Sequence, residues 1–244
     1  QMTKHACMAL LVSLGISGWL LCHGLGGVAA TFAQSPPDTK FGGTYRRTLF
    51  KNPPTLDPAF TTDVFSRAVV SQLFDGLVQF DAHLNPIPAL AEFWEASQDR
   101  RTWTFYLRRG VKFHHGREVT ADDFVYSFSR LLKATKPGPL TELLRRIQGA
   151  KDVRPGKTDE IQGLQAVDRY TLRMVLEEPF APLLAALGLA NAAVVPREVV
   201  EQQGEHFARA PVGTGPFTFV RWEPGREIVL QANEQYYEGR PFLD

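Results

Sequence analysis

The sequence predicts a mixed α/β fold in which short strands and helices alternate along most of the chain. Trp103, Phe105 and Leu107 recur at every second position, which is the pattern of a strand with one face on a core. A helix signature follows, in which Thr120 is a good N-cap and the apolar residues of 124–132 recur at helical spacing. The 44% hydrophobic and 11% aromatic content is sufficient for a packed globular core.

The residues before the central block, which comprises 89–132, predict a strand, a helix and a second strand. Residues 44–50 read as the first core strand, which ends at 52–54 because proline removes a backbone donor and restricts the residue before it. Apolar spacing predicts a helix at 66–74. A strand at 77–80 and a turn at 81–86 then lead into the central block.

The central block and the remainder of the chain predict further short elements. A proline-rich break at 136–139 ends the central helix, and Pro182 suits the first turn of a later one. The predicted elements are, in order, strands at 94–97, 102–108 and 111–113, a turn at 114–116, helices at 120–132 and 140–147, a hairpin of 165–167 and 171–176, a helix at 182–189, a strand at 194–195, a helix at 196–203, and a hairpin of 217–222 and 228–232.

The first 33 residues predict an export signal. Lys4 precedes an apolar run, and the small residues ending at Ala33 suit cleavage before Gln34, with 34–40 as a flexible start of the mature chain. A membrane anchor is the alternative, but the apolar run is short for a span. Lipid attachment at Cys22 is a further alternative, which Leu21 disfavours because that processing requires a small residue before the cysteine.

Composition excludes several classes of function. Removal of 1–33 takes away Lys4 and both cysteines, and the remaining 26 basic and 26 acidic residues give no net charge with histidine neutral. A balanced charge without a basic patch argues against nucleic-acid binding. A mature chain without cysteine has neither a disulfide framework nor a cysteine metal site.

No residue set predicts catalysis, a cofactor or a metal ion. His114 and His115 are adjacent and lack a third ligand at useful spacing, so we interpret them as a polar turn. The Asp122–Asp123 pair is explained by its place in the first turn of a helix. The 213–216 loop is glycine-rich, but Pro216 deletes a donor that a phosphate site needs, which favours a conformational role. We therefore expect no enzyme activity from these residues.

Several motifs occur in a fixed order between about Phe41 and the last residue. Thr55-Leu56-Asp57-Pro58 is followed by Leu73-Phe74-Asp75-Gly76-Leu77, and the central block then precedes the PVGTGPF sequence of 211–217. Together they resemble the family 5 extracellular solute-binding proteins, which bind oligopeptides, dipeptides, nickel complexes or some sugars for ABC importers. His115 is a departure, since the family usually has aspartate there.

The resemblance implies the first lobe of a periplasmic-binding-protein-like (type II) fold. Residues 41–75 and 191–244 would form the lobe itself, and 76–190 an inserted subdomain. The 233–241 segment leads toward a second lobe in such proteins. We expect the chain to be the N-terminal part of a two-lobed receptor whose second lobe lies outside these 244 residues.

The resemblance also implies where a ligand binds. In peptide-binding relatives the segment after Leu-Asp-Pro lies along the cleft, which here comprises Thr61, Thr62, Asp63 and Val64. Their backbone would pair with an extended peptide like an added strand. The 134–140 loop, which ends at Leu140, is a second candidate for the pocket wall.

We therefore expect a monomeric periplasmic protein that binds a peptide or similar small solute and delivers it to an ABC permease in the inner membrane. The sequence does not separate peptides from nickel chelates or sugars. A secreted hydrolase with its active site in the second half, and a signalling or chaperone-like receptor, remain alternatives. The fragment alone is expected to bind ligand weakly, because relatives contribute much of the closing surface from the second lobe.

Overall fold

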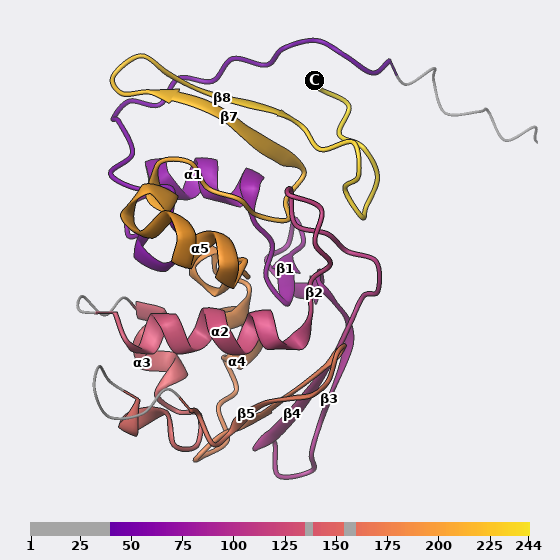
Figure 1. Ribbon diagram of the computed structural model, residues 1–244. Coiled ribbons are helices and arrows are strands. Elements are labelled where there is room, and N and C mark those ends of the chain that lie inside the picture. The colour runs from indigo at the N-terminus through magenta and orange to yellow at the C-terminus, as the bar shows by residue number, and fades with distance from the viewer. Residues whose placement is uncertain (1–39, 135–138, 154–159) are drawn as a thin grey trace, which may run out of the picture. The chain divides into compact units, whose positions relative to one another are not determined.

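The computed structural model describes residues 40–134, 139–153 and 160–244, and it has the mixed α/β character predicted from the sequence (Figure 1). The helices and strands are, in order, η1 (Pro58–Phe60), α1 (Val64–Leu73), β1 (Val78–Phe80), β2 (Pro86–Pro88), β3 (Ala91–Ala96), β4 (Thr102–Leu107), α2 (Ala121–Leu132), α3 (Pro139–Leu144), η2 (Ala150–Asp152), β5 (Leu164–Asp168), β6 (Thr171–Val175), α4 (Leu183–Leu187), η3 (Ala190–Ala192), α5 (Arg197–Gln203), η4 (Gly204–Ala208), β7 (Phe217–Glu223) and β8 (Glu227–Ala232).

A four-stranded antiparallel sheet with the order β3-β4-β6-β5 forms one layer. The period-two pattern of β4 is confirmed, because Trp103, Phe105 and Leu107 are buried while the intervening side chains are half-buried. Phe105 lies opposite Leu172, and Trp103 lies opposite Met174. These pairs give the sheet one continuous apolar face.

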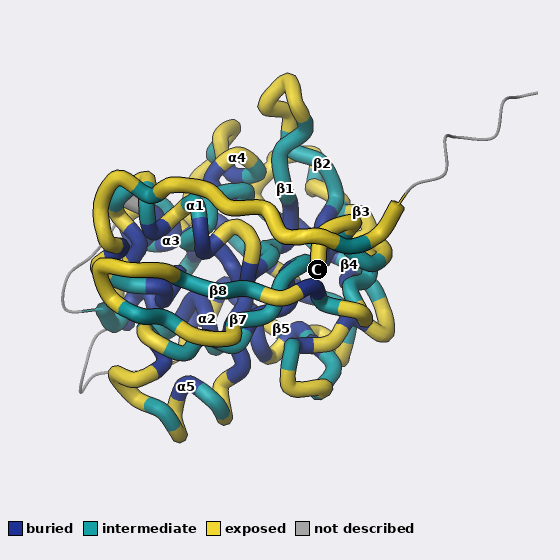
Figure 2. Tube along the Cα trace, turned by 90° about the horizontal axis from the view of Figure 1, so that it is seen from above, coloured by how far each residue is buried: buried dark blue, intermediate teal, exposed yellow. Residues whose placement is uncertain are grey.

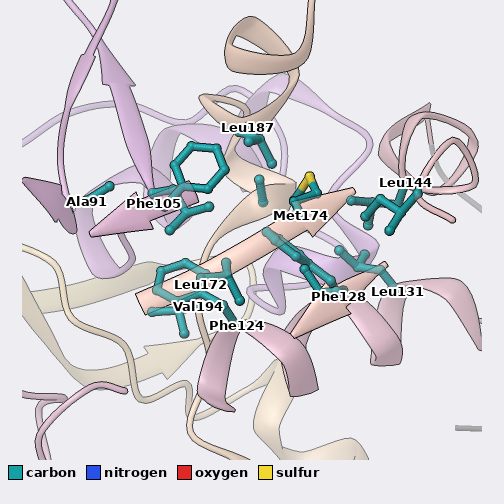
Figure 3. Packing of buried hydrophobic residues seen from close by; sticks show 14 of the residues in the cluster. Ala91, Phe105, Phe124, Phe128, Leu131, Leu144, Leu172, Met174, Leu187 and Val194 are labelled. Carbon is teal, nitrogen blue, oxygen red and sulfur yellow. The ribbon is translucent and has the colours of Figure 1, made fainter. Parts of the chain in front are cut away.

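Helix α2 covers that apolar face (Figures 1 and 3). Its start is fixed by the predicted N-cap Thr120 and a capping box, in which Asp123 Oδ2 accepts from the amide of Thr120 at 2.9 Å. Phe124, Phe128 and Leu131 are buried and belong to the same cluster as the apolar residues of the sheet. The helix and the sheet therefore form the main hydrophobic core.

A second hydrophobic cluster surrounds α1, η4 and α5, and residues of the β7–β8 hairpin pack against it. Helix α1 contacts both β7 and η3. The buried members of this cluster are Leu56, Val69, Val70, Leu73, Phe74, Ala193, Val195, Val200 and Phe207. Its member Leu56 lies just before the segment from Pro58 to Asp63, and Val69, Val70 and Leu73 lie in the helix that follows this segment.

The predicted strand at 44–50 is wrong. No strand of the described ranges pairs with it, and its aromatic side chains Tyr45 and Phe50 are exposed. Most residues of this segment are exposed (Figure 2). Residues 44–53 lie beside the β7–β8 hairpin and α1, and a groove of about 1120 Å³ separates them. A segment forms a strand only where a second strand supplies backbone partners, and no part of the described chain does so here.

Two other short strands are absent from the described chain. Residues 111–113 contribute only an isolated bridge between Lys112 and Glu118. Val194 and Val195 are buried but form no strand. Short apolar runs signal burial, and burial alone does not fix the backbone.

Several predictions fall outside the described residues or remain untested. The predicted signal segment lies outside them, as do residues 34–39 and most of the 136–139 break. The boundaries of the inserted subdomain stay a prediction. Within the described ranges no helix combines the length and the apolar character needed to cross a membrane.

Candidate functional site

The segment predicted to contact ligand, Thr61 to Val64, follows a turn that the Leu-Asp-Pro motif builds. Asp57 is the N-cap of η1, and its Oδ1 accepts from the amide of Ala59 at 3.0 Å. Pro58 occupies the first position of the turn, where its fixed φ is favourable. The amide of Thr61 then closes the turn by donating to Pro58 O at 3.3 Å.

The segment ends at the N-cap of α1. Asp63 Oδ1 accepts from the amides of Phe65 at 3.0 Å and Ser66 at 2.9 Å. Burial raises the pKa of Asp63, but the hydrogen bonds from Ser66 and Phe65 outweigh it and leave the pKa below the ordinary value. Thr61 and Asp63 both have extended backbone, so Thr62 lies in a short extended stretch between two capped ends.

Side chains along this stretch alternate between solvent and protein. Phe60 is 42% exposed, Val64 is 65% exposed, and Thr62 is also exposed. Thr61, between them, is only 1% exposed, and its hydroxyl donates to Asp57 O at 3.0 Å. Among the described residues neither the amide nor the carbonyl of Thr62 has a hydrogen-bond partner. The stretch therefore has the properties of a free strand edge.

The turn is anchored from behind by two side chains distant in sequence. Arg130 on α2 forms a bidentate ion pair with Asp57, whose side chain is nearly fully buried. Asn191 Nδ2 donates to the carbonyls of Pro58 and Thr61, both at 2.8 Å. Sequence reasoning missed both anchors, because spacing along the chain carries no signal for partners this far apart.

Leu140 lies in a different environment from the other predicted contact residues. It belongs to helix α3, is 1% exposed, and is part of the main hydrophobic cluster. Its side chain thus packs in the core and presents no surface to a ligand in this structure. The structure brings Thr61, Thr62, Asp63 and Val64 together, and their contact with ligand stays a prediction.

A largely half-buried polar cluster surrounds the 211–216 loop. Thr214 Oγ1 donates to Asp75 Oδ2 at 2.9 Å, and the hydroxyl of Tyr236 donates to Asp75 Oδ1 at 3.3 Å. Burial raises the pKa of Asp75 to about 6, although these two hydrogen bonds oppose the rise. Sequence reasoning read Asp75 only as part of a family motif.

The glycines of this loop are required by close backbone contact. A Cβ on Gly213 would lie 1.9 Å from Leu73 O, and a Cβ on Gly215 would lie 2.6 Å from the carbonyl carbon of the same residue. No side chain fits at either position without moving the end of α1. The loop is thus a packing device, consistent with the conformational role that the sequence suggested.

The two adjacent histidines have different partners. His114 Nδ1 accepts from the amide of Gly213 at 3.2 Å, so its Nε2 donates to Gly215 O at 3.1 Å. His115 Nε2 lies 2.8 Å from Glu198 Oε1. Across the described ranges no group of three or more histidine, cysteine, aspartate or glutamate side chains is placed to bind a metal ion.

The chain is similar to a known protein family and to proteins of known function. The model of the bacterial extracellular solute-binding proteins, family 5 middle region, matches residues 85–244. Di/tripeptide-binding protein 2 of Pseudomonas aeruginosa is 34% identical over 206 residues, which cover 79% of this chain and 38% of that protein. The periplasmic oligopeptide-binding protein OppA of Salmonella typhimurium is 32% identical over 219 residues, which cover 86% of this chain and 40% of that protein.

Solved structures give the same result. OppA of Haemophilus influenzae in complex with the peptide RPPGFSPFR has a TM-score of 0.71 and 30% identity, over 77% of this chain and 38% of that one. MoaA from A. tumefacien R10 in complex with mannopinic acid has a TM-score of 0.68 and 32% identity, over 80% of this chain and 38% of that one. The chain spans about two fifths of the length of the curated relatives it matches. It belongs to the family 5 bacterial extracellular solute-binding proteins.

Proposed function

We propose that the chain is part of the substrate-binding component of an ABC importer and binds an extended peptide along Thr61–Val64. The observation that carries this proposal is the free backbone of Thr62, held in an extended stretch between two capped ends. The names of the di/tripeptide-binding and oligopeptide-binding relatives support peptide as the ligand class.

The chemistry of the stretch suits recognition of a peptide backbone. An extended peptide that pairs with a strand edge exchanges amide and carbonyl hydrogen bonds, which are the same for every sequence. The neighbouring side chains of Phe60 and Val64 are apolar and exposed, so they would offer ligand side chains an apolar surface. Affinity would then come from the backbone, and selectivity from the surfaces around it.

The proposal includes export and transfer of the ligand. Residues 1–33 would direct the chain to the periplasm, where a monomeric receptor passes its ligand to an inner-membrane permease. No nucleic acid, metal or cofactor takes part in this function. Ligand binding would shift the receptor toward the closed form that the permease recognises, because the ligand binds the closed state more tightly.

A weak interaction is expected from this chain alone. A receptor with micromolar affinity gains about 8 kcal/mol on binding, and loss of half of that leaves about 4 kcal/mol, which corresponds to about millimolar affinity. This affinity sets the ligand concentration for a direct test.

The test is a titration of the ¹⁵N-labelled 244-residue chain with trialanine at millimolar concentrations, followed by amide NMR. We expect the largest shifts at Thr62 and its neighbours, and a much smaller effect from trialanine that is N-methylated at its peptide bonds. Mannopinic acid has no peptide backbone and should leave the Thr62 amide unshifted. Absence of a trialanine response at Thr62, or an equal response to the methylated peptide, would contradict the proposal.

A further inference from the structure

A single side chain holds both ends of the turn that precedes Thr62. Asn191 Nδ2 donates one hydrogen to Pro58 O and the other to Thr61 O, each at 2.8 Å. Both partners are carbonyl oxygens, which only accept, so the atom facing them must be the amide nitrogen. The amide group of Asn191 therefore has one permitted orientation at this site.

The support for Asn191 is itself fixed. The residue lies in η3, and the next residues, Ala192 and Val194, are fully buried. The amide of Ala192 donates to Leu189 O at 2.8 Å, and the amide of Val194 donates to Asp75 O at 3.0 Å. The donor is thus presented from a short element that is packed and hydrogen-bonded on both sides.

The bond to Thr61 O has a consequence for the next amide. In a trans peptide unit the carbonyl of one residue and the N–H of the following residue point in opposite directions. Because the Thr61 carbonyl points toward Asn191, the Thr62 N–H points away from it. Thr62 is exposed, and its amide has no partner among the described residues.

We propose that Asn191 is a positioning residue that orients the Thr62 N–H outward as the donor for a backbone carbonyl of a bound peptide. This inference rests on the proposed function for the ligand, but the orientation itself does not require one. Asn191 touches no ligand in this proposal and acts through the Thr61–Thr62 peptide plane. Asp57 and Arg130 hold the start of the same turn, whereas among the described residues only Asn191 donates to the carbonyl next to Thr62.

The orientation can be measured directly. Residual dipolar couplings of the ¹⁵N-labelled 244-residue chain report the direction of the Thr62 N–H bond without any ligand. Two variants remove the donor in different ways. Asn191→Asp keeps the shape but places oxygen against two carbonyls, and Asn191→Ala removes the group. Asn233→Asp is the matched control, because Asn233 Nδ2 also donates to a loop carbonyl, that of Gly215 at 3.0 Å.

We expect the Thr62 coupling to change in both Asn191 variants and to be unchanged in Asn233→Asp. Trialanine should bind both Asn191 variants about tenfold more weakly than the wild-type chain, because its carbonyl partner is no longer presented. Dispersed amide signals from the β3–β6 sheet serve to confirm that each variant is folded. A purely structural role would lower thermal stability and leave the Thr62 coupling unaltered.

The outcomes separate the two proposals. An unchanged Thr62 coupling in both Asn191 variants overturns the positioning role, whatever the peptide does. A changed coupling combined with no trialanine response in the wild-type chain supports the positioning role and overturns the peptide assignment. A changed coupling combined with a tenfold loss of trialanine affinity supports both.

Discussion

Arg130 and Asp57 form a buried ion pair that joins helix α2 to the turn beneath the candidate site, 73 residues earlier in the chain. The Asp57 side chain is 3% exposed and that of Arg130 is 19% exposed. The guanidinium also lies over the rings of Phe60 and Phe207, at 5.4 and 5.8 Å from their centroids. The pair therefore links the main hydrophobic core to the segment from Pro58 to Asp63.

Removal of one partner should be costly. Arg130→Met leaves the Asp57 carboxylate buried without its counter-charge, which is expected to lower the free energy of unfolding by about 3–5 kcal/mol. Urea denaturation at 25 °C measures this change. Arg226→Met is the control, because Arg226 is 75% exposed in its pair with Glu223 and such pairs contribute about 0–1 kcal/mol. Similar losses in the two variants would contradict the structural role of the buried pair.

Asp75 should make stability depend on pH. Its pKa is raised by burial to about 6 in the folded chain, against about 3.9 when unfolded. The folded state therefore binds more protons than the unfolded state between these values, and stability falls as pH rises through about 6. This difference in proton binding corresponds to about 2 kcal/mol of stability lost between pH 4 and pH 7. The facing groups are Thr214, Tyr236, Tyr237 and Glu238.

Asp75→Asn should remove this contribution, since an amide stays neutral across the range. Urea denaturation at several pH values gives the unfolding free energy of each chain. The value for the variant minus that for the wild-type chain should increase from pH 4 to pH 7, because only the wild-type chain loses stability over this range. Asp81→Asn is a suitable control, because hydrogen bonds from Asn85 lower the pKa of the partly exposed Asp81 and keep it ionised above pH 4. A difference that stays constant with pH in Asp75→Asn would show that Asp75 titrates normally.

Alanine substitutions at three glycines should be ranked by the space available. The new Cβ would lie 1.9 Å from Leu73 O at Gly213, 2.6 Å from Leu73 C at Gly215, and 3.2 Å from Leu187 O at Gly76. Each close atom belongs to backbone, so relief requires movement of the chain. We expect the loss of thermal stability to increase in the order Gly76, Gly215, Gly213. Equal melting temperatures for the three variants would mean that the loop relaxes freely.

Local signals in the sequence predicted most of the helices and hairpins. Thr120 and Asp123 specify the start of α2 through contacts three residues apart, and alternation in β4 specifies its buried face. The sequence also predicts a strand at 44–50, and none forms there. The difference is a partner strand, which depends on the topology of the whole sheet and is not encoded within seven residues.

The candidate site was predictable as a position along the chain and not as a geometry. The Leu-Asp-Pro motif locates the turn, and the apolar spacing of α1 locates its end. Neither feature indicates that Arg130 and Asn191 hold the turn, because both partners come from elements far away in sequence. Leu140 shows the converse limit, since a residue beside a loop in sequence proved to belong to the core.

Arg117 bridges two helices, and its two carboxylate partners should differ in their importance. It donates to Asp123 at 2.6 and 2.9 Å and to Glu198 at 2.6 and 3.0 Å. The Asp123 side chain is 6% exposed, whereas that of Glu198 is 47% exposed. Loss of a hydrogen bond matters most where the remaining partner stays buried.

Arg117→Met should therefore lower the free energy of unfolding by about 1–3 kcal/mol, because it leaves the buried Asp123 carboxylate with fewer donors. Glu198→Gln should cost less than about 1 kcal/mol, because water replaces the lost partner at the surface. Urea denaturation at low and high salt distinguishes the two, since screening weakens only the exposed interaction. If Glu198→Gln destabilised the chain as much as Arg117→Met, the link between α2 and α5 would depend on the surface carboxylate and not on the buried one.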